Sequence, residues 1–346
     1  MELINETPLR GLAFRQFDME GGLDCVVALR GVFAHVQNTR MAWQEDQPPF
    51  QWEDAYDGAP HDSALVQQTD LTPGKAGTDI TFLGVSYPAR PPATEWHCSL
   101  AIGPVAKVLR VTGPRHLVPQ KQKRKRWGGP QISGWVPGPA EPTDTVPMDW
   151  RFAYGGAPAS GPKDAEPDPR NPIGRGNPGG AEPENARPVP APQIVLLDGP
   201  FDAAPVGLGP VAPFWKGRAD HAGTYDKAWQ DTRHPLLPRD FDLRFWQCAP
   251  PDQIAIPFLA GDEGYRLTAL SPTFPDAVGW LPGIALAVQL NGGHWRRLDL
   301  DGVHFDWRAD HRVTLTWRTR FPLPDADGAK LRIGWRYDAR MAEGAA

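Results

Sequence analysis

The stretch DFDLRFWQCAPPDQ (240–253) places three carboxylates, an arginine, three aromatic rings and two prolines in close succession. Asp240, Asp242 and Asp252 could act together as general acids and bases. In turns rich in proline and aromatic residues, an aspartate more often caps backbone amides or pairs with a neighbouring arginine such as Arg244. The pattern therefore favours a rigid structural corner, and a hydrolase that uses the three aspartates is the alternative.

The hexapeptide GRGNPG (174–179) matches the G-x-G-x-x-G pattern of dinucleotide sites. That pattern binds a pyrophosphate only when it lies between a strand and the N-terminus of a helix. Prolines flank the hexapeptide on both sides, so that neither element is expected there. A glycine-rich turn is the simpler interpretation.

The run KQKRKR (121–126), followed by Trp127, has the composition of a segment that contacts a phosphate backbone. The chain as a whole has a net charge of −5, and no second basic cluster accompanies the run. A long-range attraction to nucleic acid or to an anionic membrane is therefore not expected. We interpret the run as a solvated loop and expect no nucleic-acid partner and no membrane partner.

Sequence motifs for metal binding and nucleophilic catalysis do not occur. The histidines are scattered, and there is no H-E-x-x-H, Cys-x-x-Cys or G-x-S-x-G pattern. Cys25, Cys98 and Cys248 lie far apart in apolar surroundings, which suits free thiols in a reducing compartment. The first residues do not resemble a signal peptide, and the longest uncharged stretch is too short to span a bilayer. We therefore expect a cytoplasmic protein without metal, cofactor or enzymatic activity.

The composition indicates a folded chain with stiff loops. Gly 36 and Pro 40 make up an unusually large share of the 346 residues. Trp 14 and Phe 14 argue against general disorder, because such large apolar side chains need a core or a partner.

Segments rich in β-branched and aromatic residues recur at short intervals near both ends of the chain. The expected strands are 25–36, 79–87, 96–103 and 106–113 in the first part, and 265–270, 283–290, 296–307, 312–321 and 330–337 in the last part. In RVTLTWRTRF (312–321), apolar residues alternate with threonine and arginine, which predicts a half-buried strand with one face in water.

The sequence thus predicts a mainly β protein of two sandwich-like, antiparallel lobes, joined by a long, irregular Pro/Gly-rich segment with little helix. The N-terminal lobe is expected at 1–117, the irregular middle at 118–252 and the C-terminal lobe at 253–346. One short helix is expected near 224–233, with Thr224 as its N-cap and Pro235 after its end.

Several motifs resemble those of one known family. They are SALVQQTDLTPGKAGTDITFLGVSYP (63–88), MDWRFAYGG (148–156), PRNPIGRG (169–176), AGTYDKAWQDTRHPLLPRDFDLRFWQCAPPDQ (222–253) and RVTLTWRTRFPL (312–323). In this order they resemble a domain-of-unknown-function family encoded beside VgrG spike and PAAR-repeat genes in bacterial type VI secretion clusters. The resemblance extends from about Phe14 to Tyr337. Some members carry pentapeptide repeats, which this chain lacks, and its basic run and Cys248 depart from the family pattern.

The resemblance implies an effector adaptor or chaperone. Such a protein would hold a toxic effector, or its PAAR-bearing N-terminal region, until it is loaded on the VgrG spike. The alternatives from other classes are the hydrolase described above and a carbohydrate-binding β-sandwich, since tryptophan-rich β surfaces stack on sugar rings.

An adaptor holds its client through a few aromatic and arginine anchors. The expected partner-binding residues are Trp150, Arg151, Tyr154, Arg244, Phe245 and Trp246. A second set is expected to define the fold: Gly155, Gly156, Arg170, Asn171, Pro172, Gly174, Arg175, Asp240, Asp242, Pro250, Pro251, Asp252 and Gln253. The arginines of the middle segment are expected to clamp carbonyl groups or the acids of 240–252.

Overall fold

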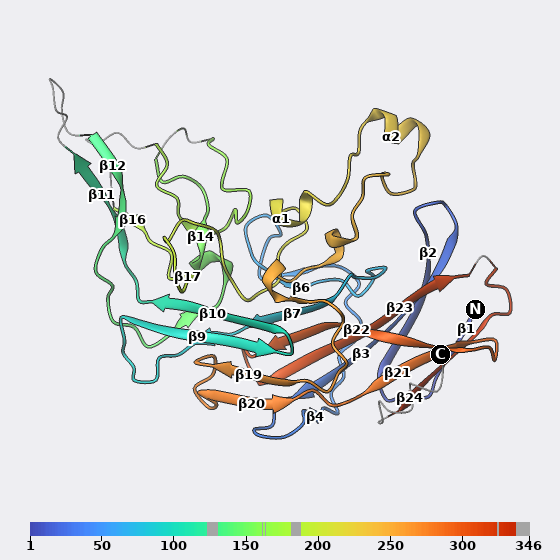
Figure 1. The fold of residues 1–346 in the computed structure, drawn as a ribbon. Coiled ribbons are helices and arrows are strands. Elements are labelled where there is room, and N and C mark those ends of the chain that lie inside the picture. Colours follow the sequence, from blue (N-terminus) through green and yellow to red (C-terminus); the bar gives the residue numbers. More distant parts are fainter. Residues whose placement is uncertain (123–130, 161, 163, 181–187, 324, 337–346) are drawn as a thin grey trace.

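The computed structural model describes residues 1–122, 131–160, 162, 164–180, 188–323 and 325–336. Strands dominate these residues and the two α-helices among them are short, so the prediction of a mainly β fold with little helix is confirmed. Two larger sheets form the body of the molecule, while the β11–β12 hairpin and the segment that carries α2 project from it (Figure 1).

The larger sheet has ten strands in the described residues. Its main path is β1 (Glu2–Asn5), β24 (Lys330–Arg336), β21 (Ala285–Leu290), β22 (Trp295–Asp306), β23 (Arg312–Pro322), β3 (Leu23–Ala34) and β2 (Arg10–Phe17). β7 (Thr78–Leu83) pairs with β22 and with β18 (Ile254–Ala255), and β4 (Ala42–Trp43) pairs with β3. The second sheet runs β17 (Ile194–Leu196), β10 (Val105–Thr112), β9 (Glu95–Ile102), β19 (Gly264–Thr268) and β20 (Asp276–Trp280).

Smaller elements complete the described chain. A three-stranded sheet joins β12 (Gln131–Pro137), β11 (His116–Gln122) and β16 (Val189–Pro190). Two-stranded pairs are β13 (Val146–Pro147) with β8 (Val85–Ser86), β14 (Tyr154–Gly155) with β15 (Arg175–Gly176), and β5 (Ala55–Tyr56) with β6 (Leu65–Gln67). The helices are α1 (Lys216–Ala219) and α2 (Lys227–Thr232), with the 3₁₀ turns η1 (Trp150–Phe152), η2 (Leu243–Trp246) and η3 (Pro251–Gln253).

The two β-rich ends of the chain share both sheets. β3 is antiparallel to β23 along almost its whole length, and β7 is parallel to β22. In the second sheet, β9 pairs with β10 on one side and with β19 on the other. The segments 1–117 and 253–346 are therefore interleaved rather than segregated, because each contributes central strands to the same sheets.

One large apolar core joins the two sheets. The inward residues of the larger sheet, such as Phe82, Phe305 and Trp317, belong to the same buried cluster as Leu100 and Leu109 of the second sheet. A smaller cluster centres on Trp150 and Trp215, two indole rings in edge-to-face contact at 5.5 Å. This smaller cluster anchors the irregular middle of the chain.

The polar face of β23 is only partly open to water: Arg320 is exposed, as the alternation predicts, but the middle of this face is covered. Thr314 and Thr316 are half-buried, and Arg318 is 4% exposed. Residues of 66–79 and Cys248 lie over this face. Sequence periodicity does not link them to the strand. The result is a buried polar layer above a sheet whose other face packs into the core.

Several local predictions need correction. The expected helix is present as α2, but its N-cap is Asp226, whose carboxylate accepts a hydrogen bond from the amide of Trp229 at 2.8 Å. Thr224 instead donates to Asp240. Part of the segment expected to be irregular forms the β11–β12 hairpin, and residues 123–126 of the basic run lie outside the described residues.

Candidate functional site

The corner, residues 240–253, begins with an aspartate–arginine pair that fixes η2. Asp242 is the N-cap of this turn and accepts hydrogen bonds from the backbone amide and the Nε of Arg244, at 2.9 and 2.8 Å. These bonds from Arg244 lower the pKa of Asp242 to about 2. Arg218 of α1 donates to the carbonyl of Phe245 at 3.0 Å and lies over its ring. The side chain of Asp242 therefore stays charged and engaged in the turn.

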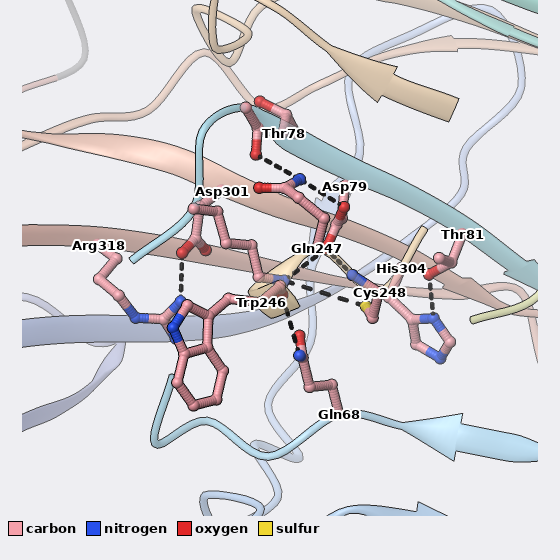
Figure 2. A network of polar contacts seen from close by, with 12 residues as sticks. Gln68, Thr78, Asp79, Thr81, Trp246, Gln247, Cys248, Asp301, His304 and Arg318 are labelled. Carbon is pink, nitrogen blue, oxygen red and sulfur yellow. Dashed lines mark hydrogen bonds and ion pairs between the residues drawn. The ribbon is translucent and has the colours of Figure 1, made fainter. Parts of the chain in front are cut away.

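The middle of the corner is bound to the start of β7. Asp79 accepts hydrogen bonds from Gln247 Nε2 at 2.7 Å and from the amide of Cys248 at 2.8 Å. Gln247 also accepts from the amide of Ala76 at 2.8 Å. Figure 2 shows Asp79 facing Gln247 and Cys248, with Gln68 reaching the carbonyl of Trp246. Buried side chains thus attach the middle of the corner to the segment that leads into β7.

The end of the corner is bound to both sheets. Gln253 is fully buried and donates to the carbonyls of Ile80 and Leu208, at 2.8 and 3.0 Å. The ammonium of Lys107, from β10, binds the side chains of Asp252 and Gln253 at 2.8 and 2.9 Å. Burial lowers the pKa of Lys107, although the charge of Asp252 opposes this shift. Pro250 and Pro251 start the 3₁₀ turn that presents these two side chains.

The three aspartates of the corner do not meet in one site. Asp240 accepts hydrogen bonds from the amide and hydroxyl of Thr224, at 3.0 and 2.7 Å, and Asp242 and Asp252 have the separate partners described above. Each carboxylate instead closes or anchors a different part of the backbone.

A layer of three buried ion pairs lies next to the corner, and Figure 2 shows one of them, Arg318 with Asp301. The polar layer consists of Arg30–Asp70, Lys75–Asp79 and Arg318–Asp301, all with side chains less than a tenth exposed. Burial raises the pKa of Asp301 in spite of Arg318 and Lys75. Burial also opposes the charge of Lys75, but Asp79, Cys248 and Asp301 together outweigh it, and the pKa of Lys75 is raised. Buried charges of this kind are tolerated only when paired, so that the layer needs every partner.

A cavity of about 60 Å³ borders the polar layer. It is lined by Lys75, Asp301, His304 and several threonines. His304 Nδ1 lies 2.8 Å from the hydroxyl of Thr81, and burial lowers the pKa of this imidazole from 6.5 to about 4. A polar cavity of this size has room for a few water molecules. Sequence periodicity did not indicate this group, since its members come from distant segments.

The backbones of the motifs AYGG and PRNPIGRG pack closely against each other. Asn171 is fully buried and donates to the carbonyls of Trp150 and Tyr154, at 2.8 and 2.9 Å. A side chain at Gly155 would approach the carbonyl of Asn171 to 2.3 Å, and one at Gly156 would approach the carbonyl of Gly174 to 2.0 Å. Both glycines have positive φ angles. Pro172 lies half-buried in the same turn.

Of the arginines in the middle segment, Arg175 does clamp a carbonyl, that of Arg151, at 2.6 Å. Arg170 pairs with Asp168, and Arg151 with Asp149 and Asp57. No bond among the described residues joins these arginines to the acids of 240–252, contrary to that part of the prediction. Arg151 and Arg170 instead pair with the aspartates two residues before them, Asp149 and Asp168.

The expected partner-binding residues are not equally accessible. Trp150 is 5% exposed and donates its indole N–H to the carbonyls of Gly209 and Pro210, so it belongs to the core rather than to a contact surface. Tyr154, Phe245 and Trp246 are half-buried, whereas Arg151 and Arg244 are exposed. The aromatic rings of Phe241, Phe245 and Trp246 pack against one another.

The arm, residues 222–239, presents an exposed aromatic side chain that the sequence analysis did not single out. Tyr225 is 52% exposed and packs edge-to-face on Trp229. Leu243, just past the arm, is 41% exposed next to Arg244. Two hydrogen bonds from Thr224 to Asp240 join the beginning of the arm to the residue that follows its end, and we call this link the neck. The neck brings Tyr225 near the start of the corner. We call Tyr225, Leu243 and Arg244 the arm surface.

Other reactive groups are buried or dispersed. The three cysteines are free and buried, and burial raises the pKa of Cys25 to about 11 and that of Cys98 and Cys248 to about 12. Among the described residues, metal-binding side chains do not gather in a group of three or more. No described helix has the length and apolar character needed to cross a bilayer.

Together, the fold and the site define a mainly β protein with a deeply anchored, irregular corner across its sheets. The model of an uncharacterized protein family conserved in bacteria (DUF2169) matches residues 20–318. The chain belongs to this family. No curated protein and no solved structure matches this chain.

Proposed function

We propose that this protein is a cytoplasmic adaptor or chaperone of type VI secretion. It binds a secreted effector, or the PAAR-bearing N-terminal region of that effector, and helps to load it on the VgrG spike. The proposal starts from the motif resemblance described above. The observation that supports it most is the arm surface, where exposed apolar side chains and an arginine stand on a backbone that side-chain hydrogen bonds hold in place.

The anchoring of the arm and corner favours protein binding for a physical reason. Association is weakened by the conformational entropy lost when flexible contact residues become ordered. Here Thr224 and Asp240 close the neck, and Arg233 attaches the arm to the carbonyl of Met19. Contact residues on such a frame are ordered before the partner arrives. Aromatic and arginine side chains are also those that most often dominate binding energy at interfaces.

The hydrolase hypothesis has weaker support, because Asp240, Asp242 and Asp252 have separate partners and do not converge on a cavity. A general acid and base must both reach the reacting group.

The experiment is co-expression of the chain with the effector encoded beside it, followed by affinity purification and mass spectrometry. We expect the effector or its PAAR-bearing region to co-purify at a fixed ratio, and deletion of the adaptor gene to abolish effector secretion. A gene neighbourhood without VgrG or PAAR genes, together with secretion that persists in the deletion strain, would contradict the proposal.

A further inference from the structure

Two arginines at the base of the β11–β12 hairpin have no hydrogen-bond acceptor among the residues that the structure describes. Arg110 lies near the end of β10, and Arg115 directly precedes β11. Both side chains are half-buried. The Nε atom of each is buried and has no hydrogen-bond partner. A guanidinium group taken partly out of water without an acceptor is costly, so that this arrangement requires an explanation.

The other buried arginines of the described residues have at least one acceptor, although the Nε atoms of Arg30 and Arg318 also lack a partner. Arg30 and Arg318 are buried against Asp70 and Asp301, and Arg218 donates to the carbonyls of Val211 and Phe245. Other arginines without a described acceptor are on the exposed surface: Arg90, Arg239, Arg296 and Arg297. Arg110 and Arg115 alone among the described arginines are half-buried and have no acceptor.

The two guanidinium groups also repel each other. Burial lowers the pKa of Arg115, and the charge of Arg110 lowers it further. Glu95 acts in the opposite direction but forms no ion pair with either arginine. Two like charges that share a half-buried site are stabilised when an anion lies between them.

A hydroxyl group next to Arg110 is also without a partner. Thr112 is fully buried and its Oγ1 atom has no hydrogen bond. Because alternate residues of a strand face the same side, the side chains of Thr112 and Arg110 emerge on one face of β10. On that face, Arg110 lies opposite His97, and Thr112 lies opposite Glu95. Unpartnered donors of two chemical types are therefore collected at one end of the second sheet.

We propose that Arg110, Arg115 and the hydroxyl of Thr112 bind a small oxyanion, a phosphate or carboxylate group. The planar guanidinium fork matches two oxygens of either group, and a hydroxyl can donate to a third. This site is separate from the arm surface and does not depend on the proposed adaptor function.

The test is a titration of the purified protein with inorganic phosphate and, separately, with acetate, at constant ionic strength in chloride. The ¹⁵N–¹H signals of the arginine Nε groups and the thermal unfolding temperature report binding. We expect a saturable shift of the Arg110 and Arg115 signals. If only phosphate binds, the site is assigned to phosphoryl groups. If acetate binds, the site is assigned to carboxylates. The absence of a saturable shift with both anions would overturn the proposal.

Three variants separate a built site from general charge effects. Arg115→Gln should weaken anion binding by about tenfold or more, since it removes a charge-assisted hydrogen-bond donor. Arg115→Lys keeps the charge but loses the fork, and should also weaken binding. Arg239→Gln removes an exposed, unpaired charge elsewhere and should leave binding unchanged. Equal weakening by Arg239→Gln and Arg115→Gln would show that only net charge matters and would refute the site.

The stability of the same variants gives a second readout. Without added anion, Arg115→Gln should unfold at a temperature equal to or above that of the wild type, because one repulsion is removed. In saturating anion the order should reverse, because only the wild type gains binding energy. A variant that is less stable by the same amount with and without anion would assign Arg115 to a purely structural role.

Discussion

At the scale of single residues, Asn171 shows how the irregular middle of the chain is held. Its buried amide donates to two carbonyls from the preceding motif, those of Trp150 and Tyr154. Asn171→Ala should lower the free energy of unfolding by about 1–3 kcal/mol, because each carbonyl loses a hydrogen bond and only that of Trp150 keeps a second one, from the amide of Ala153. Urea unfolding measures this, with Lys216→Ala as the control, since its exposed ion pair with Asp220 is worth about 0–1 kcal/mol. Equal effects of the two variants would contradict the structural role of Asn171.

His304 predicts a pH dependence of stability. Its imidazole has a pKa of about 4 in the folded protein and 6.5 in its ordinary state. The unfolded chain therefore binds more protons between these values, and stability decreases as the pH falls from 6.5 to 4, by up to about 3 kcal/mol. Urea unfolding across this range should show a shallower pH dependence for His304→Gln. An unchanged slope in that variant would show that other groups cause the loss.

The distance between partners along the chain decides which contacts the sequence could predict. Arg244 stands two residues from Asp242, and that pairing was open to prediction from the motif. Asp79 and Gln247 are 168 residues apart, and Lys107 and Asp252 are 145 apart. Nothing in a local pattern links such residues. Lys107 is also a polar residue on the inward face of a strand, which strand periodicity alone would place in water.

At the scale of elements, the strands with strong alternation, such as β22 and β23, were predictable, and the short or proline-containing ones were not. Pro119 interrupts the pattern of β11, and the adjoining basic run suggested a loop. The whole polar face of β23 was predicted to be open to water, because a strand pattern cannot reveal that loops from other segments cover the middle of it. The arm was predicted only as a helix, without its neck.

The neck of the arm can be opened selectively. Asp240→Ala removes both hydrogen bonds to Thr224, so that the arm should fluctuate more while the sheets stay intact. Trypsin should then cleave at Lys227 or Arg233 several-fold faster than in the wild type, by an order-of-magnitude expectation for a loosened loop. The control Asp231→Ala breaks an exposed pair within α2 and leaves the neck unchanged. Similar cleavage rates in Asp240→Ala and the wild type would argue against the neck.

At the scale of the whole molecule, the interleaving of the two chain ends predicts cooperative folding. β3 and β7 take their partners β23 and β22 from the other end of the chain. A fragment of residues 1–117 should therefore lack stable tertiary structure, with poorly dispersed amide signals in its NMR spectrum. The full chain is the control. A well-dispersed spectrum of the fragment would show that the N-terminal segment folds as an independent lobe.

The central claim is that the arm surface binds the secreted client. Its most direct test is the dissociation constant for the client's N-terminal region, measured by calorimetry. We predict that the double variant Tyr225→Ala/Leu243→Ala weakens binding by about tenfold or more, because a few anchor residues, tyrosine among the commonest, dominate such interfaces. The control Val108→Ala, at a 43% exposed position on the second sheet, should bind like the wild type. A folded double variant with the wild-type dissociation constant would contradict the claim.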